Sequence, residues 1–443
     1  MFSVVTVLVG LGSGLCAICL GLLLHFLEHI AFGYSLVSLF SHESFPEGVS
    51  NAPPLRRLAV VIGCGLVAGI GAASLYRWGN PLVSVSKAVG PNVPTMPLAS
   101  TLVESVLQIV AAALGSPLGH EVAPRAVGAL IAGRLCQLTG LSVRDTQIMV
   151  ACGAGAGLAA LYNVPVAATI FVAEVLLRSA RPSILLPAIV ACAIAAVVAQ
   201  ASLGGEPLYA VAIEPVGISL VIAAVVSGPV FGLAGVAFRR LMKHAQLAAP
   251  TGSRLIVSSV LAFVVVGLLA FNFPQLLGNG RGPAQLTFSD GIEPRLAITL
   301  LALKVAVIAV VLRGGARGGL MTPGFASGAL LATIFGSIWN VFLPDIPLAV
   351  FSVVGAATFL GTSMCMPITA IALAMEFVHL PMVYLVPLAG AAAGAFAVRL
   401  LLERPVAQFG VSPMIVPEGR SDNHPQQFLS RRPRNDRAAV NSR

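Results

Sequence analysis

The stretch GSPLGHEVAPR, residues 115–125, places one carboxylic acid, Glu121, in the middle of a strongly apolar chain. Pro124 follows the acid by three residues, a position that suits the first turn of a helix. The next residues, 126–132, are small or apolar and favour helix. We therefore expect Glu121 at a helix N-terminus, where backbone N–H groups lack intrahelical partners.

Such a helix N-terminus is an anion site, because its free N–H groups and the helix dipole attract negative charge. An ionised Glu121 can occupy this site itself, whereas a protonated Glu121 can yield it to a diffusing anion. The same side chain would then be both a gate and a proton carrier. The structural alternative is that Glu121 only caps the helix and pairs with Arg125. Ionisable residues inside membrane segments are costly and usually functional, which favours the first interpretation.

The sequence contains no clear metal-binding or catalytic motif. His120 and Glu121 begin an HExxH pattern, but Pro124 stands where the second zinc-binding histidine belongs. The seven cysteines are scattered, and Cys16 and Cys19 lie in an apolar helical run where packing explains them. We expect no metal site, no cofactor, no catalytic residue and no enzymatic activity.

A second stretch, GGLMTPGFASGALLATIFG at residues 318–336, has the same glycine pair, proline and small-residue helix. Leu320 stands there in place of the acid, and Thr322 adds a hydroxyl that can serve as an anion ligand or a simple N-cap. A third break occurs at Asn80, which precedes a proline and is either an anion donor or only a turn residue. With Glu121 as the gating and proton-transfer residue, the anion-binding candidates are Asn80, Gly119, Val122, Met321 and Thr322.

Composition places these stretches in a membrane. Of the 443 residues, 57% are hydrophobic and 10% charged, and the mean hydropathy is +0.94. One helical crossing takes about 20 residues, so more than about ten helical segments fit, the first opening the chain. Several are interrupted by Gly or Pro, and such breaks are tolerated at membrane depth where protein buries them or they line a polar cavity. The sequence predicts an all-α polytopic membrane protein with broken helices around a pathway.

The chain is also predicted to be a duplication, because two blocks recur with matching spacing. The first block pairs three residues with three others in the same order: Gly115, Gly119 and Pro124 with Gly314, Gly318 and Pro323. The second block pairs Gly153, Pro165 and Glu174 with Gly355, Pro367 and Glu376. The expected units are a first membrane repeat at 1–205 and a second at 206–416. Equivalent positions of Glu174 and Glu376 predict a shared structural duty.

The net charge of +9 is concentrated toward the C-terminus. Residues 417–443 are polar and rich in arginine, which predicts a disordered tail on the cytoplasmic side by the positive-inside rule. A nucleic-acid-binding arm is the alternative. Basic tails next to membrane helices are usually topology signals, so no nucleic acid is expected as a partner.

Over roughly residues 5 to 405, these stretches resemble the CLC family of chloride channels and anion/proton antiporters. GHEVAP is similar to the family's Gly-Lys/Arg-Glu-Gly-Pro segment, and GGLMTPGFASGALL to its Gly-x-Phe-x-Pro segment. The resemblance implies two inverted-topology repeats of tilted and broken helices. It also implies a homodimer in the lipid bilayer of the cell inner (plasma) membrane, with one anion pathway in each subunit.

Three departures from the common pattern resemble the fluoride/proton antiporter branch. They are Glu-Val-Ala-Pro instead of Glu-Gly-Pro, Asn80 instead of an anion-coordinating serine, and Val175 where chloride/proton antiporters carry a second acid. The expected function is fluoride export driven by proton entry, with Glu121 alternately binding protons and blocking the anion path. The alternatives are a chloride/proton antiporter or a passive chloride channel. The family's late tyrosine has no clear counterpart near Phe409.

Overall fold

The computed structural model describes residues 1–33, 45–91, 94–289, 292–343 and 345–403. Within these ranges the chain is helical, and the only β-type pairing is an isolated bridge between Gly119 and Gly319. The predicted all-α fold is confirmed. The predicted tail at 417–443 and the segment around Phe409 lie outside the described residues.

The first half of the chain forms nine α-helices and one π-helical turn within the described ranges. They are α1 (Phe2–Phe32), α2 (Phe45–Asn51), α3 (Pro54–Trp78), α4 (Val85–Ala88), α5 (Leu98–Ala113), α6 (Val122–Thr139), α7 (Val143–Tyr162), α8 (Pro165–Phe171), η1 (Val172–Leu176) and α9 (Pro182–Leu203).

The described residues of the second half form eight α-helices and two short 3₁₀ turns. They are α10 (Ile218–Leu247), α11 (Arg254–Leu269), η2 (Pro274–Leu276), α12 (Arg281–Phe288), α13 (Pro294–Arg313), α14 (Met321–Phe342), α15 (Leu348–Ser363), α16 (Pro367–Phe377), η3 (Met382–Tyr384) and α17 (Leu385–Leu402). Proline opens α3, α8, α9, α13 and α16, where its missing N–H costs no intrahelical bond.

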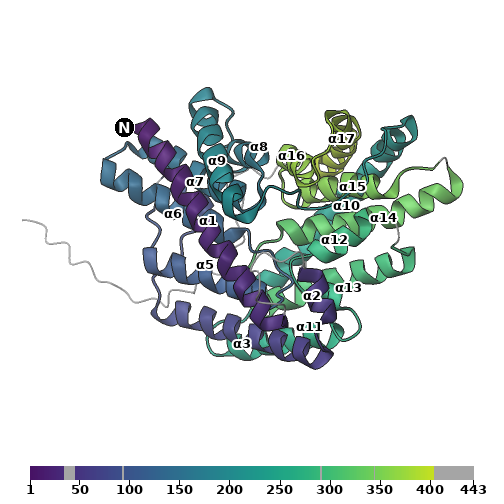
Figure 1. Ribbon diagram of the computed structural model, residues 1–443, viewed down its shortest axis with the longest axis horizontal. Helices are drawn as coiled ribbons and strands as arrows, with labels where there is room; N and C mark the ends of the chain where they lie inside the picture. Colours follow the sequence, from purple (N-terminus) through teal and green to yellow (C-terminus); the bar gives the residue numbers. More distant parts are fainter. Residues whose placement is uncertain (34–44, 92–93, 290–291, 344, 404–443) are drawn as a thin grey trace, which may run out of the picture.

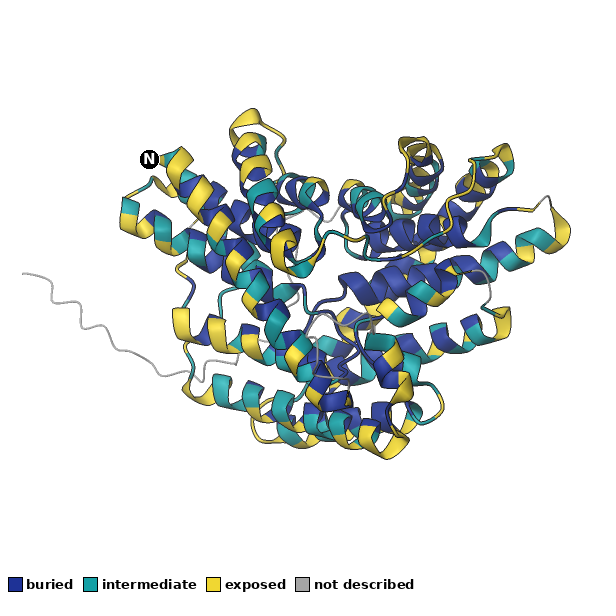
Figure 2. Ribbon diagram, in the orientation of Figure 1, coloured by how far each residue is buried: buried dark blue, intermediate teal, exposed yellow. Residues whose placement is uncertain are grey.

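Seven of the described helices are long and apolar enough to cross a membrane. They are Phe2–Phe32, Pro54–Trp78, Pro182–Leu203, Ile218–Leu247, Pro294–Arg313, Met321–Phe342 and Met382–Leu402. Five further apolar helices of 10–17 residues, among them α5 and α16, are too short to span fully, as the glycine and proline breaks predict. Large apolar side chains are exposed on the outer helix faces, and Figure 2 shows burial concentrated at the centre. This surface suits lipid, and the chain is a multi-span membrane protein.

The two halves repeat each other at the turns that lead into α6 and α14. Gly115 and Gly315 both have positive φ, 89° and 88°, and each lies two residues after the end of α5 or α13. Glu121 and Leu320 are both the N-cap residues of the following helices. The match of Glu121 with Leu320 therefore holds, but Gly115 is equivalent to Gly315 and not to Gly314. The segment from the turn glycine to the helix N-cap is therefore one residue longer before α6 than before α14. An alignment of the two halves without a gap does not show this difference.

The second repeated block follows the sequence spacing without a shift. Asn163 and Cys365 both adopt left-handed backbone, with φ of 55° and 60°, and each lies two residues before the proline that opens α8 or α16. The helix pairs before these turns pack closely through glycine. A Cβ on Gly153 would collide with the carbonyl of Gly128 across α6 and α7, so only glycine permits this approach.

Glu174 and Glu376, which lie at equivalent positions of the two repeats, cap each other's helices. The Glu174 carboxylate accepts hydrogen bonds from the N–H groups of Ile368 (3.0 Å) and Thr369 (2.7 Å) at the start of α16. The Glu376 carboxylate accepts from Val166 (2.9 Å) and Ala167 (2.7 Å) at the start of α8. Helices α8 and α16 lie side by side near the centre of Figure 1. The shared structural duty is confirmed: each acid satisfies N–H groups of the other repeat.

Removal of either cap should lower stability. A lost helix cap with charge-assisted hydrogen bonds costs about 2 kcal/mol, so Glu174→Ala and Glu376→Ala should each lower the Tm of the detergent-solubilised protein by several degrees. Glu293 is the matched control, because this exposed acid precedes α13 without a side-chain capping bond. Equal Tm values for Glu174→Ala and Glu293→Ala would contradict the capping role.

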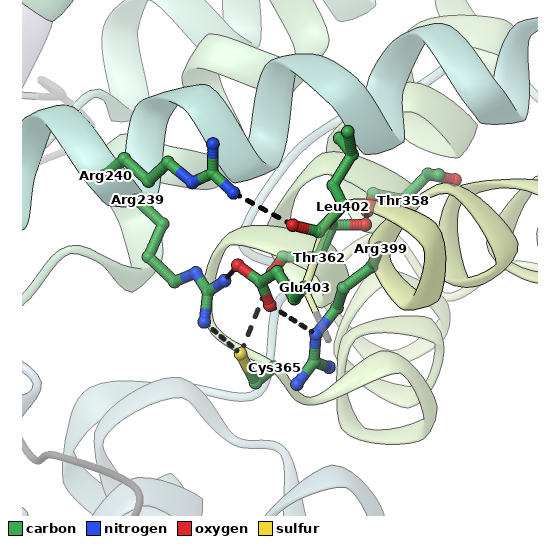
Figure 3. Close-up of polar contacts among 8 residues, drawn as sticks. All are labelled: Arg239, Arg240, Thr358, Thr362, Cys365, Arg399, Leu402 and Glu403. Carbon is green, nitrogen blue, oxygen red and sulfur yellow. Dashed lines mark hydrogen bonds and ion pairs between the residues drawn. The ribbon is translucent and has the colours of Figure 1, made fainter. Parts of the chain in front are cut away.

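A second polar cluster joins the end of α17 to α10 and to the turn between α15 and α16 (Figure 3). Glu403 pairs with Arg239 and, at 3.3 Å, with Arg399, while Arg239 also donates to the Cys365 sulfur at 3.0 Å. Arg240 donates to the carbonyl of Leu402 at 3.1 Å. These contacts fix the last described helix onto the second repeat.

Candidate functional site

The two helix N-termini singled out in the sequence meet at the centre of the fold. Glu121, the N-cap residue of α6, has no exposed surface, and its Oε1 accepts a hydrogen bond from the backbone N–H of Met321 at 2.9 Å. Met321 is the first residue of α14. The carboxylate of one repeat thus lies at the positive end of a helix from the other repeat, where an anion would bind.

Two glycines make room for this carboxylate. Gly119 and Gly319 exchange backbone hydrogen bonds of 2.8 Å and 2.6 Å, which join the loops before α6 and α14. A Cβ on Gly319 would overlap Glu121 Oε1, and a Cβ on Gly119 would overlap Oε2. Any larger residue at either position would occupy the space that the carboxylate fills.

The other Glu121 oxygen, Oε2, is buried and lacks a hydrogen-bond partner in the described part of the chain. Arg125 does not supply one: its Nε donates to the main-chain carbonyl of Glu121 at 2.9 Å, and its guanidinium lies 5.4 Å from the ring centre of Phe171. The described residues therefore show no hydrogen bond or ion pair between the side chains of Glu121 and Arg125, the contact that the structural alternative requires. A carboxylate held by a single bond can leave its position at low cost.

Thr322 lies in the first turn of α14, beside Met321, and is 2% exposed. Its hydroxyl forms a hydrogen bond of 2.9 Å with the hydroxyl of Tyr162, the last residue of α7. No motif in the sequence points to Tyr162. The only signal for it is a tyrosine immediately before the Asn163 turn, and its proximity to Thr322 depends on the packing of α7 against the second repeat.

Of the predicted site residues, the structure gathers Glu121, Gly119, Met321 and Thr322, and Val122 opens α6 beside them. Asn80 differs. It is exposed in the segment between α3 and α4, and no hydrogen bond links its side chain to these residues within the described ranges. Its assignment as an anion ligand stays a prediction.

Two cations, one buried and one partly exposed, hold the loops around the site. Lys304 is fully buried and donates to the carbonyls of Leu276 (2.9 Å) and Gly278 (2.6 Å). Gly278 in turn donates its N–H to the carbonyl of Gly115, in the loop that leads to Glu121. This chain of hydrogen bonds ties the loop before α6 to the second repeat.

On the other loop, Arg317 precedes α14 by four residues and is paired with Glu104 of α5 at 3.3 Å. Its guanidinium lies 4.8 Å from the ring centre of Tyr76, and Gln108 donates to the same Glu104 side chain at 3.1 Å. The ion pair joins the loop before α14 to the first repeat. Both loops of the site are therefore held by contacts that cross between the repeats.

In the part of the chain that the structure describes, no group of three or more His, Cys, Asp or Glu side chains could hold a metal ion. The site offers instead two helix N-termini, one titratable carboxylate and hydroxyl donors. Such an arrangement can bind a small anion at the helix N-termini, and its carboxylate can take up or release a proton.

Comparison with known proteins supports the same picture. The model of the voltage gated chloride channel family matches residues 76–400. A putative chloride channel protein ClcB-like from Ralstonia nicotianae is 28% identical over 73% of this chain and 78% of its own length. The H(+)/Cl(-) exchange transporter ClcA of Vibrio vulnificus is 26% identical over 60% of this chain and 59% of its own length.

Two solved structures share the fold. A slow cyanobacterial Cl⁻/H⁺ antiporter aligns with a TM-score of 0.78 and 18% identity, covering 93% of this chain and 96% of its own. A CLC-type fluoride/proton antiporter aligns with a TM-score of 0.72 and 19% identity, covering 89% and 94%. These likenesses support the predicted all-α polytopic membrane fold for this chain. The chain belongs to the voltage gated chloride channel (CLC) family, whose matched members are channels and proton-coupled exchangers.

Proposed function

We propose that the protein is a fluoride/proton antiporter that exports fluoride as protons enter, with Glu121 as the gate. The observation that carries the proposal is the hydrogen bond from the Met321 N–H to the Glu121 carboxylate, made in a buried site. An ionised Glu121 and a free anion compete for the same backbone donor. Protonation removes the charge that holds Glu121 there, so proton uptake and anion entry are coupled.

The proton is expected to travel on the same side chain that gates the anion. Val175 of η1 is apolar and packs against the core, so it offers no second titratable group at that position. The neighbouring acid, Glu174, is fully engaged with the N-terminus of α16. Glu121 would therefore carry protons without an internal acid at position 175, as the fluoride branch pattern implies.

Fluoride binds water more tightly than chloride, so its site must replace that hydration with strong donors. The proposed donors are the backbone N–H groups at the starts of α6 and α14, around Gly119, Val122 and Met321, together with the Thr322 hydroxyl. Asn80 would contribute an amide N–H from the exposed segment after α3. These donors are fixed by helix geometry, so they need little reorganisation when the ion enters.

Chloride/proton exchange is the second candidate function. It is favoured by the relatives named as H(+)/Cl(-) exchange transporters and by the structural neighbour described as a Cl⁻/H⁺ antiporter. Asn80 and Val175 favour fluoride, because both resemble the pattern of the fluoride/proton antiporter branch. A passive chloride channel is the remaining alternative.

Transport by purified protein in liposomes tests the proposal. With an imposed fluoride gradient, a fluoride electrode and a pH dye should record fluoride efflux together with proton uptake, and the reversal potential should shift with the pH gradient. Chloride efflux measured in the same way should be at least roughly tenfold slower. Equal or faster chloride exchange would favour the second candidate, and a reversal potential insensitive to pH would indicate a channel.

The family resemblance supports further proposals on organisation. We infer a homodimer with one pathway per subunit, transport rather than enzymatic activity, and residence in the plasma membrane. The repeats would extend over 1–205 and 206–416, with their boundary in the segment between α9 and α10. Residues 417–443 would form a basic cytoplasmic tail.

A further inference from the structure

Tyr162, the last residue of α7 in the first repeat, brings a hydroxyl to the start of α14 in the second repeat. Its side chain is 8% exposed and belongs to the same buried cluster as Met321 and Phe325. The ring of Phe377 meets the Tyr162 ring edge-on, with centres 5.5 Å apart, and holds its orientation. The hydroxyl ends 2.9 Å from Thr322 Oγ1, one residue from the N–H that binds Glu121.

The hydrogen atoms of this pair can be counted. Each hydroxyl has one hydrogen and can both donate and accept. The bond between Tyr162 and Thr322 uses one of the two hydrogens, whichever residue donates it. Neither hydroxyl makes another hydrogen bond to the described residues. One O–H therefore stays available at the buried start of α14.

An unused donor in a buried site is costly unless a ligand accepts from it. An unused acceptor lies close by, since Glu121 Oε2 is buried without a partner while Oε1 is bound to Met321. The open donor indicates a place for an occupant that accepts hydrogen bonds strongly, and the open Oε2 shows that Glu121 itself does not take up this donor. An anion is such an occupant.

We propose that Tyr162 is a further anion-coordinating residue that favours fluoride. With Glu121 displaced, Thr322 donates its hydrogen to the Tyr162 oxygen and Tyr162 donates the remaining hydrogen to the ion, so the Thr322 hydroxyl acts on the ion through Tyr162. The proposal rests on the anion-transport function above and deepens it. A small, strongly accepting ion gains most from such a donor, because the donor replaces part of a tight hydration shell.

Binding measurements on Tyr162→Phe test this role. The substitution keeps the ring and its contact with Phe377 and removes only the hydroxyl. Fluoride affinity, measured by titration calorimetry in detergent, should fall roughly tenfold, as expected for a lost hydrogen bond to an ion. Chloride affinity should change less, so that the fluoride-to-chloride ratio of affinities decreases. An unchanged fluoride affinity and an unchanged ratio would overturn the proposal.

Two further variants separate coordination from packing. If the hydroxyls act as one donor, adding Thr322→Val to Tyr162→Phe should weaken fluoride binding by much less than the sum of the single effects. Additive losses would contradict the shared hydrogen. Tyr384→Phe is the matched control, because Tyr384 lies in the same buried cluster and its hydroxyl already donates to the carbonyl of Glu214. An equal loss in Tyr384→Phe would assign the effect to packing.

The wild-type assay keeps the two claims apart. If wild-type protein exchanges chloride and not fluoride, the proposed substrate is wrong, yet Tyr162→Phe should still weaken chloride binding severalfold. If wild-type protein exports fluoride and Tyr162→Phe binds it normally, the substrate stands and the role of Tyr162 is wrong.

Discussion

Glu121→Gln protein in liposomes is expected to move protons at least about 100-fold more slowly than wild type under the same fluoride gradient. Glutamine has nearly the shape of glutamate, and its amide oxygen can still accept from the Met321 N–H. An amide neither binds nor releases a proton near neutral pH, however. Any fluoride flux that remains should therefore be uncoupled from pH.

The measurement is simultaneous recording of fluoride release and external pH at matched protein density. Glu174→Gln is the matched control, because it makes the same substitution in an acid that is bound to the start of α16 and is remote in role from the anion. It should lower the Tm and keep the proton-to-fluoride ratio. A wild-type ratio in Glu121→Gln would remove the carboxylate from the mechanism.

The site is built from features that the sequence shows with different clarity. Glu121 and the start of α14 could be predicted, because a proline three residues after an acid and a small-residue helix are local signals. A shared structural role for Glu174 and Glu376 could also be predicted, because the two acids have equal spacing in both repeats. Their actual partners, on the opposite repeat, follow only from how α8 and α16 pack.

Other parts depend on contacts that no local pattern encodes. The hydroxyl pair joins residues 160 positions apart, through the ends of helices from different repeats. The equivalence of Gly115 with Gly315 was missed because one additional residue before α6 shifts the register at the site itself. An alignment of the two halves without a gap pairs Pro124 with Pro323 correctly, but it pairs Gly115 with the wrong glycine.

Asn80 shows the converse. Its amide and the following proline fit both an anion ligand and an ordinary turn, and its side chain is exposed in the segment between α3 and α4. Whether it meets the ion depends on how the segment after α3 borders the pathway, which is a tertiary property. The hydrogen-bonded centre, in contrast, needs only the two helix starts to face each other.

The second large effect is expected from filling the space between Gly119 and Gly319, in the loops before α6 and α14. Gly319→Ala should reduce fluoride transport at least about tenfold, because its methyl group would occupy the place of Glu121 Oε1. The backbone itself tolerates alanine, since φ at Gly319 is not in the left-handed region. The loss should therefore come from the filled space, which both the carboxylate and the competing anion use.

Gly324→Ala is the matched control on α14. A Cβ there meets its nearest neighbours, Ser363 Oγ at 3.5 Å and Leu360 Cδ1 at 3.8 Å, at ordinary contact distances. Alanine also favours helix over glycine by up to about 1 kcal/mol, so this variant should be at least as stable as wild type and transport normally. Monodisperse elution and an unchanged Tm for Gly319→Ala would show that its defect is not unfolding.

A double variant identifies what the methyl group displaces. In Gly319→Ala with Glu121→Ala the carboxylate is absent, so the space it held is free and the anion can pass beside the small side chains. Fluoride flux should then recover, without proton movement, and the two substitutions should be strongly non-additive. If the single Gly319→Ala variant instead keeps wild-type fluoride flux and wild-type coupling, the carboxylate does not need the place between Gly119 and Gly319, and the competition between Glu121 and the anion for that place is refuted.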